Sequence, residues 1–372
     1  MIIFFGLLIV ISLYGIKVAV GSENRQLSTG DSKGILFNKN AKWNIDYLSK
    51  EKTNAIKGVF VMIVLISHYC NYYRFDNPTD KWVSHFIGGV IGQLMVVMFL
   101  FYSGYGVMES YKRKGKLYAV NMPVQRILKL WFDFDVIVLI FFAIYVAFGK
   151  QWTVKRLVLS LVGWDSYGNS NWYIFAVFFC YVFSFIAFMI AKKKYLGVTT
   201  IVTVLCILFE VVVNQYKNSY WTNTILCYAL GMWYSVYKEK IEKVIQKNNF
   251  TWVLSFGFLA VLSLVLWRYK NSFEYMFEIR ALVAALFVVC ATMKFSVDNA
   301  VLRFLGSYVF GIYMLQKVPT GIMENLGLID GNYIYLKFAI TIVLTVILAY
   351  GHNYFMVFTS KLFKRAEIKK AK

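Results

Sequence analysis

One stretch of the sequence determines how the chain folds: Asn54-Ala-Ile-Lys57-Gly-Val-Phe-Val-Met-Ile-Val-Leu-Ile-Ser-His68-Tyr-Cys-Asn-Tyr-Tyr-Arg74. It is apolar enough to form a membrane-spanning helix, but it contains Lys57 near its start and His68 in its interior. A helix places these two side chains on one face, about 16 Å apart along its axis. An ionisable ring that deep in a bilayer is costly and indicates a function. The alternative is that Lys57 anchors the helix end and His68 is a packing residue.

The composition predicts an all-α polytopic membrane protein. Of the 372 residues, 59% are hydrophobic and only 16% are charged, which is too apolar for a soluble globule of this length. The net charge of +21 does not indicate a nucleic-acid partner, because the basic residues fall in short runs between apolar segments. We therefore expect the protein to be embedded in a lipid bilayer.

The five cysteines predict neither a metal site nor a disulfide framework. All five lie within apolar segments, without the close Cys or His spacing of a metal site. We therefore expect small packing residues and no bound metal.

Ten apolar runs follow the N-terminal one. They cover residues 57–74, 87–108, 128–148, 171–191, 198–214, 219–237, 251–268, 279–293, 301–317 and 332–358. We divide the chain into an N-terminal membrane helix (1–20), a polar cytoplasmic segment (21–53), a membrane domain (54–358) and a basic cytoplasmic tail (359–372). Residues 1–20 lack the basic start of a signal peptide, so a retained helix is the preferred interpretation.

The basic residues also predict the orientation. If the 57–74 helix runs outward, the connections on the cytoplasmic side hold more than twice as many Lys and Arg residues as those outside. We therefore expect a multi-pass protein of the cell membrane, with its N-terminus outside and its C-terminus in the cytoplasm.

The sequence of the first predicted core helix resembles that of a known protein family. Asn-Ala-Ile-Lys-Gly, followed by an apolar run ending Ile-Ser-His, resembles the acyltransferase-3 family of integral membrane proteins, in which a basic residue, ten others and a histidine form a signature. Lys57 and His68 match that spacing. The resemblance covers residues 48 to 358 and implies ten core helices, an acyl-CoA donor and a glycan acceptor. It also makes Lys57 a donor-binding candidate.

The second core helix ends in Met98-Phe-Leu-Phe-Tyr-Ser103-Gly104-Tyr105-Gly106, which resembles the family's Phe-Phe-x-x-Ser-Gly element. Small residues let a ligand or another backbone approach closely. Ser103 and Gly104 are therefore candidates for binding the acyl-CoA, and an ordinary helix contact is the alternative.

Arg126 and Lys129 stand where the family usually has Arg-x-x-Arg. On a regular α-helix they share a face with Asp133. Two cations at the cytoplasmic mouth suit the phosphates of acyl-CoA, although lysine lacks the bidentate geometry of arginine. Positive-inside anchoring with a salt bridge to Asp133 is the alternative.

An aromatic segment, Asn171-Trp172-Tyr173, opens the helix that resembles the family's fourth core helix. Sugars stack on flat rings, so these residues, together with Asp165 before them, are candidates for binding the acceptor. The alternative is an ordinary aromatic belt. Glu210 is an intramembrane carboxylate and a further candidate. Gln316 stands where family members often have histidine, so we assign it no catalytic role.

The resemblance implies a membrane O-acyltransferase that moves an acyl group to a hydroxyl of a cell-surface or secreted polysaccharide, and we expect acetyl-CoA to be the donor. His68 is the predicted catalytic residue, since its ordinary pKa lies near the working pH. Two alternatives stay open: a transporter of anions or glycan precursors that relays protons through His68 and Glu210, and a non-catalytic scaffold.

The predicted orientation is open to direct measurement. An enzyme that is active only outside the cell, fused after Lys372, should give no signal, whereas a cytoplasmic reporter at the same position should be active. The opposite pattern would reverse the assignment of the two sides.

Overall fold

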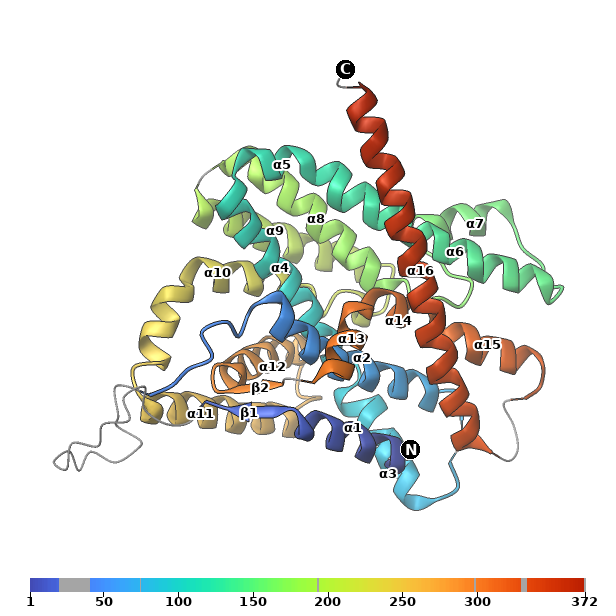
Figure 1. Ribbon diagram of the computed structural model, residues 1–372, viewed down its shortest axis with the longest axis horizontal. Helices are drawn as coiled ribbons and strands as arrows, with labels where there is room; N and C mark the ends of the chain where they lie inside the picture. Colours follow the sequence, from blue (N-terminus) through green and yellow to red (C-terminus); the bar gives the residue numbers. More distant parts are fainter. Residues whose placement is uncertain (20–40, 74, 193, 298, 329–332, 371–372) are drawn as a thin grey trace.

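The chain is almost wholly helical (Figure 1). The computed structural model describes residues 1–19, 41–73, 75–192, 194–297, 299–328 and 333–370. Its helices are α1 (Ile2–Tyr14), α2 (Lys50–Cys70), α3 (Pro78–His85), η1 (Phe86–Ile91), α4 (Leu94–Lys114), α5 (Lys116–Met122), η2 (Pro123–Leu128), α6 (Lys129–Ala147), α7 (Val154–Leu161), α8 (Trp172–Ala191), α9 (Tyr195–Val213), η3 (Ser219–Trp221), α10 (Leu226–Ile245), α11 (Asn249–Arg268), α12 (Met276–Thr292), α13 (Ala300–Ser307), α14 (Val309–Leu315), α15 (Lys317–Asn325) and α16 (Ile334–Lys370). The prediction of an all-α polytopic membrane protein is confirmed.

Seven helical segments of the described chain are long and apolar enough to cross a membrane. They are Lys50–Cys70, Pro78–Lys114, Lys116–Ala147, Trp172–Ala191, Tyr195–Val213, Asn249–Arg268 and Ile334–Ser360. The other three predicted runs also hold helices, namely α10, the 17-residue α12 and the series α13 to α15. The run predicted over 301–317 is therefore not one continuous helix, because the chain turns at Tyr308 and again at Gln316.

The N-terminal helix is shorter than the predicted 1–20 segment. It ends at Tyr14, and Ile16–Val18 forms strand β1, which pairs antiparallel with β2 (Phe295–Val297). Backbone groups that would have continued the helix bond to this strand instead. A helix of 13 residues is about 20 Å long, less than the roughly 30 Å hydrocarbon core, so whether this segment spans the bilayer stays a prediction. Most of the predicted polar segment, residues 20–40, lies outside the described residues.

Asp80 in α3 holds the beginning of the chain in place. Its carboxylate accepts hydrogen bonds from the Met1 amino group at 2.6 Å and from the Ile2 backbone N–H at 3.0 Å. The Tyr335 hydroxyl of α16 donates to the other carboxylate oxygen. Asp80 is only 2% exposed. One buried carboxylate thus joins α1, α3 and α16.

Two pairs of helices cross in direct backbone contact. A Cβ atom on Gly306 of α13 would lie 1.7 Å from the Asn54 carbonyl oxygen of α2, and one on Gly58 would lie 2.1 Å from the Leu302 carbonyl oxygen. The α4–α10 crossing is similar, because a Cβ on Gly104 would lie 2.0 Å from the Tyr228 carbonyl oxygen. Small residues at such crossings let helices pack closely without the hydrophobic effect.

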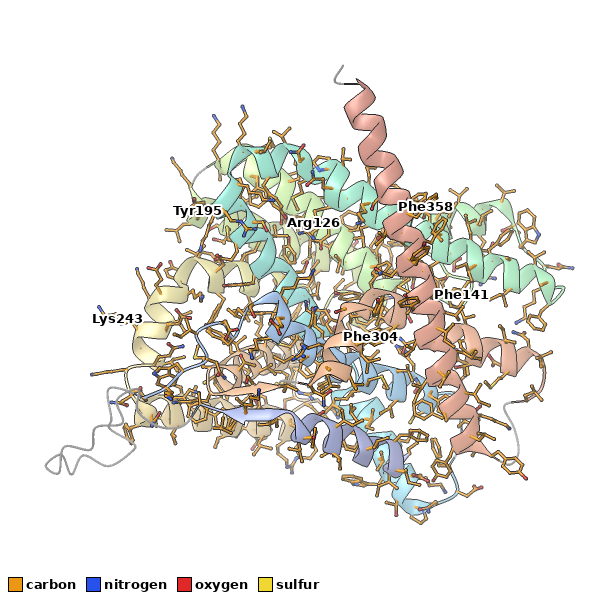
Figure 2. All side chains as sticks on the ribbon, viewed as in Figure 1. Arg126, Phe141, Tyr195, Lys243, Phe304 and Phe358 are labelled. Carbon is orange, nitrogen blue, oxygen red and sulfur yellow. The ribbon has the colours of Figure 1, made fainter. Side chains whose placement is uncertain are left out.

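The outer surface is apolar, as lipid contact requires. Trp252 is the one buried residue of helix α11, and large side chains such as Phe304 and Phe358 are 43% and 56% exposed (labelled in Figure 2). For orientation, we call the side where α2 begins the Lys50 end of the bundle and the side where it finishes the Cys70 end.

We predict that a single methyl group added at the α2–α13 crossing lowers the stability of the folded protein. Gly306→Ala should destabilise the protein by about 1–3 kcal/mol, because the added carbon meets backbone atoms that cannot rotate away. Thermal unfolding of the purified protein in detergent measures this. Gly257→Ala on α11 is the matched control, since a Cβ there meets nothing within 4 Å. Equal melting temperatures for both variants would contradict the role given to the crossing.

Candidate active site

A cavity of about 580 Å³ enters the bundle from the Lys50 end, between α2, α4, α8, η2 and α14. Its mouth is strongly basic. The wall includes the side chains Lys50, Lys57, Arg113 and Arg126, against one carboxylate, Glu109. The Glu109 carboxylate is already occupied, because it accepts hydrogen bonds from Lys112 at 3.0 Å and from Ser235 at 2.6 Å. The cavity is therefore suited to an anionic ligand.

Lys57 lies one-third of the way along α2, whose first turn is capped by Ser49. Its ammonium lies 5.5 Å from the centre of the Tyr102 ring, a cation–π distance. It makes no hydrogen bond or ion pair with any residue that the structure describes. A half-buried cation without a counter-ion favours a negatively charged ligand in the cavity.

The Ser-Gly element of α4 divides between the cavity and a helix contact. Ser103 lines the cavity, and its hydroxyl lies 3.0 Å from the Tyr181 hydroxyl of α8. Gly104 faces the other way, against the α10 backbone. The prediction that Gly104 binds the acyl-CoA is thus corrected: its missing side chain makes room for Tyr228, not for a ligand.

Arg126 and Lys129 do not act as a pair. Both side chains are exposed, but Arg126 (labelled in Figure 2) lines the cavity and lies close to Tyr118 and Tyr181, whereas Lys129 lies outside the cavity wall. The cause is the π-helical turn η2, which winds the chain less per residue than an α-helix. Side chains three positions apart then separate in direction, so the predicted two-cation clamp keeps only its arginine. No ion pair between Lys129 and Asp133 is found in the described chain.

The deep end of the cavity leads to His68 through two tyrosine rings. Tyr173 and Tyr313 both line the cavity, with their ring centres 5.2 Å apart, and the His68 ring lies 6.5 Å beyond Tyr313 at an interplanar angle of 70°. The nitrogens of His68 make no hydrogen bond to any described residue, and the ring keeps some exposed surface. Within the described chain, no other group thus occupies these nitrogens, and the catalytic role of His68 stays a prediction.

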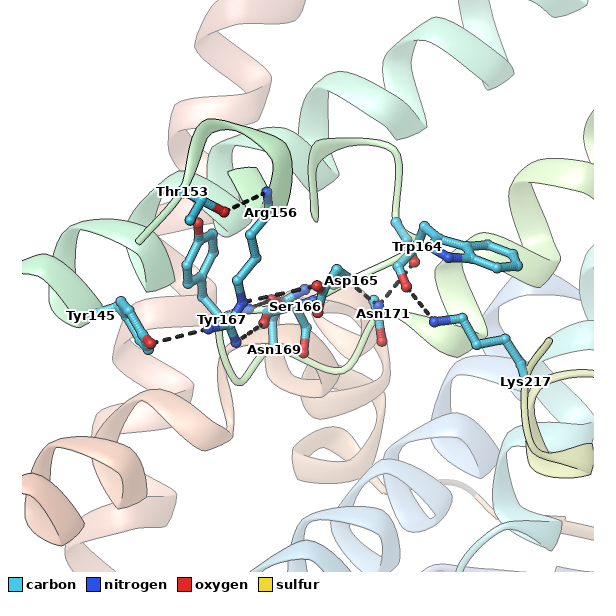
Figure 3. Close-up of polar contacts among 11 residues, drawn as sticks. Tyr145, Thr153, Arg156, Trp164, Asp165, Ser166, Tyr167, Asn169, Asn171 and Lys217 are labelled. Atoms are coloured by element: carbon cyan, nitrogen blue, oxygen red, sulfur yellow. Dashed lines mark hydrogen bonds and ion pairs between the residues drawn. The ribbon is translucent and has the colours of Figure 1, made fainter. Parts of the chain in front are cut away.

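The predicted acceptor residues do not form one surface. Tyr173 lines the basic cavity, while Trp172 packs against Tyr220. The Asn171 amide donates to the carbonyl oxygens of Gly163 at 2.9 Å and Asp165 at 2.8 Å, which fixes the loop before α8 (Figure 3).

Asp165 serves the same loop. Its carboxylate accepts from the Ser166 backbone N–H at 2.7 Å and lies 4.0 Å from the Arg156 Nε (Figure 3). The contacts that Asn171 and Asp165 make within the described chain thus stabilise this loop, and binding of the acceptor by either residue stays a prediction.

Glu210 lies away from the basic cavity. It is 5% exposed and pairs with Glu278 of α12, which is 6% exposed. The prediction that it contacts the acceptor is not supported, because helix α9 directs it into the α9–α12 contact.

The sequence analysis missed Tyr313, Tyr181 and Tyr102. Tyr313 is 2% exposed, and its hydroxyl has no hydrogen-bond partner within the described chain. It lies three residues before Gln316, a position that the resemblance to the family singled out, but only the fold places its ring beside His68. Gln316 is buried and donates to the Tyr313 carbonyl oxygen at 2.8 Å.

These features describe a multi-pass membrane protein with a basic cavity that leads toward an intramembrane histidine. The acyltransferase-domain profile of the acyltransferase-3 family matches residues 51–354, and the chain therefore belongs to that family of membrane acyltransferases. Comparison with curated proteins and with solved structures finds no match for this chain.

The unequal positions of Arg126 and Lys129 give a paired test. Arg126→Ala should raise the KM for acyl-CoA about tenfold or more with a smaller effect on kcat, because a charged contact to a phosphate remote from the reacting carbon acts as a binding group. Lys129 is three positions from Arg126 in the sequence but lies outside the cavity wall. Lys129→Ala should therefore leave the KM close to that of the wild type. Equal effects of the two substitutions would contradict the placement of Arg126.

Proposed function

We propose that this membrane acyltransferase is an O-acetyltransferase of the cell envelope, which uses cytoplasmic acetyl-CoA and acetylates a hydroxyl of a cell-surface or secreted polysaccharide. The observation that carries the proposal is a cavity with a basic mouth whose wall includes Tyr173 and Tyr313, with the His68 ring next to that of Tyr313. The orientation comes from the charge distribution, with the Lys50 end in the cytoplasm and the N-terminus outside.

The donor enters through the basic cavity. The phosphates of acetyl-CoA lie against Arg126 and Lys57, with Lys50 and Arg113 nearer the mouth. Phosphate oxygens and these cations form charge-assisted hydrogen bonds, and an arginine holds two oxygens at once. The thioester then points along the cavity toward Tyr313, away from water.

His68 acts as the general base. The imidazole takes the proton of the sugar hydroxyl as its oxygen bonds to the thioester carbonyl carbon, and the carbon–sulfur bond breaks. The proton then passes from the imidazole to the departing CoA thiolate, which leaves as the thiol. A route through an acetyl-imidazole on His68 gives the same products in two steps.

The transporter alternative depends on a second relay group. Glu210 was its candidate, but that carboxyl pairs with Glu278 instead of lining the cavity that leads toward His68. A proton path through both residues therefore has no support from the described contacts.

Substitution of His68 tests the proposal. His68→Gln keeps a polar group of similar size but cannot accept a proton, so acetyl transfer should fall by about 10²- to 10⁴-fold. The measurement is the O-acetyl content of surface glycans from cells that make equal amounts of each protein. His85→Gln on α3, which lines neither the basic cavity nor its deep end, is the control. Undiminished acetylation by His68→Gln would return His68 to a packing role.

A further inference from the structure

A second cavity, of about 270 Å³, opens at the Cys70 end of the bundle. Its wall comes from the end of α2, the end of α6, the segment that holds Arg156 and Tyr167, and α15. None of the five residues predicted to bind the acceptor lines it.

His68 is not on the wall of the second cavity, but the wall comes near it on the side of the bundle opposite to the donor. Lys317, the first residue of α15, lines it and lies close enough to His68 to interact with it electrostatically. Tyr72, four residues after His68, lines it too. The two cavities thus approach the same imidazole from opposite ends of the bundle.

One side of the second cavity is a rigid aromatic and cationic wall. The Arg156 guanidinium lies 5.1 Å from the Tyr145 ring centre and 4.7 Å from that of Tyr167. It donates to the Tyr145 hydroxyl at 3.0 Å and to the Ser166 carbonyl oxygen at 2.8 Å (Figure 3). Because its donors are occupied by the chain, Arg156 holds both rings in place.

Two other cations on the wall have no such partners. The Lys150 ammonium lies 5.5 Å from the Tyr145 ring centre, and within the described residues neither it nor the Lys317 ammonium makes a hydrogen bond or an ion pair. The one carboxylate on the wall, Glu324, is not within ion-pair distance of either. Three cations against one carboxylate give the cavity a net positive charge.

An unsatisfied hydroxyl completes the site. Tyr167 is 6% exposed, and its hydroxyl has no hydrogen-bond partner among the residues described. A buried hydroxyl is costly unless it is hydrogen-bonded, so a polar ligand in this cavity would relieve that cost.

We propose that the second cavity is the acceptor site and that it selects an anionic sugar, one that carries a carboxylate or a phosphate. Lys317 and Lys150 bind the negative group, and the sugar hydroxyls face Tyr167 and His68. The inference rests on the proposed acetyl transfer and adds the charge class of the acceptor. A neutral sugar would leave both ammonium groups uncompensated.

The test separates surface glycans by charge. Glycans from cells with and without the full-length protein are divided into anionic and neutral fractions by ion exchange, and O-acetyl is measured in each. We expect the acetyl groups that depend on this protein in the anionic fraction. Their presence in the neutral fraction would overturn the inference but keep the proposed function. No dependence in either fraction would refute acetyl transfer itself.

Three variants test whether Lys317 is the residue that selects an anionic acceptor. Lys317→Gln should lower acetylation of the anionic fraction about tenfold, as loss of a charged hydrogen bond predicts, while Lys317→Arg should restore most of it. In membranes, the KM for acetyl-CoA should stay unchanged, because Lys317 does not line the donor cavity. Lys81→Gln on α3 is the control, since Lys81 lines neither cavity. Full acetylation by correctly folded Lys317→Gln, or an equal loss with Lys81→Gln, would remove Lys317 from acceptor binding.

Discussion

The backbone contact between α2 and α13 fixes the geometry of the site. Gly58 and Gly306 let the two helices touch without side chains between them. Helix α2 carries Lys57 and His68, and α13 leads directly into α14, which carries Tyr313. A wider crossing would move Tyr313 away from the imidazole and open the space between the basic cavity and His68. The same kind of contact between α4 and α10 directs Ser103 into the cavity.

In the proposed reaction, His68 serves two substrates, and the described structure has one basic cavity on each side of it. One cavity begins among cations at the Lys50 end, the other among cations and tyrosines at the Cys70 end. Tyr313 and Lys317 lie four positions apart, on either side of Gln316, and each is close to His68. The interrupted helical segment thus supplies one wall residue to each cavity. An unbroken helix through 301–317 would place these two residues differently.

The parts of the site that sequence predicts well are those that depend on one helix. Lys57 and His68 share a face because of the α-helical repeat, and the structure keeps them so. Lys129 was paired with Arg126 by the same repeat, but a π-helical turn changes the direction between them, and no residue type announces such a turn. Asn171 and Asp165 lie next to aromatic residues in the sequence, which made them candidates for binding the acceptor. Whether their side chains bond to the chain or to a substrate depends on the conformation of the loop before α8. The surroundings of Glu210 depend on which helix lies beside α9. The role of Tyr313 depends on its position beside the His68 ring of another helix. Those are tertiary facts that a single sequence does not contain.

The pairing of β1 with β2 has a consequence for biosynthesis. Ile16 bonds in register opposite Val297, about 280 residues later in the chain. At the usual rate of translation, the N-terminal strand leaves the ribosome on the order of tens of seconds before its partner exists. During that interval its backbone groups need water or another protein as partners. The first segment to be made is therefore among the last to reach its final place, and completion of the membrane domain is what allows it to settle.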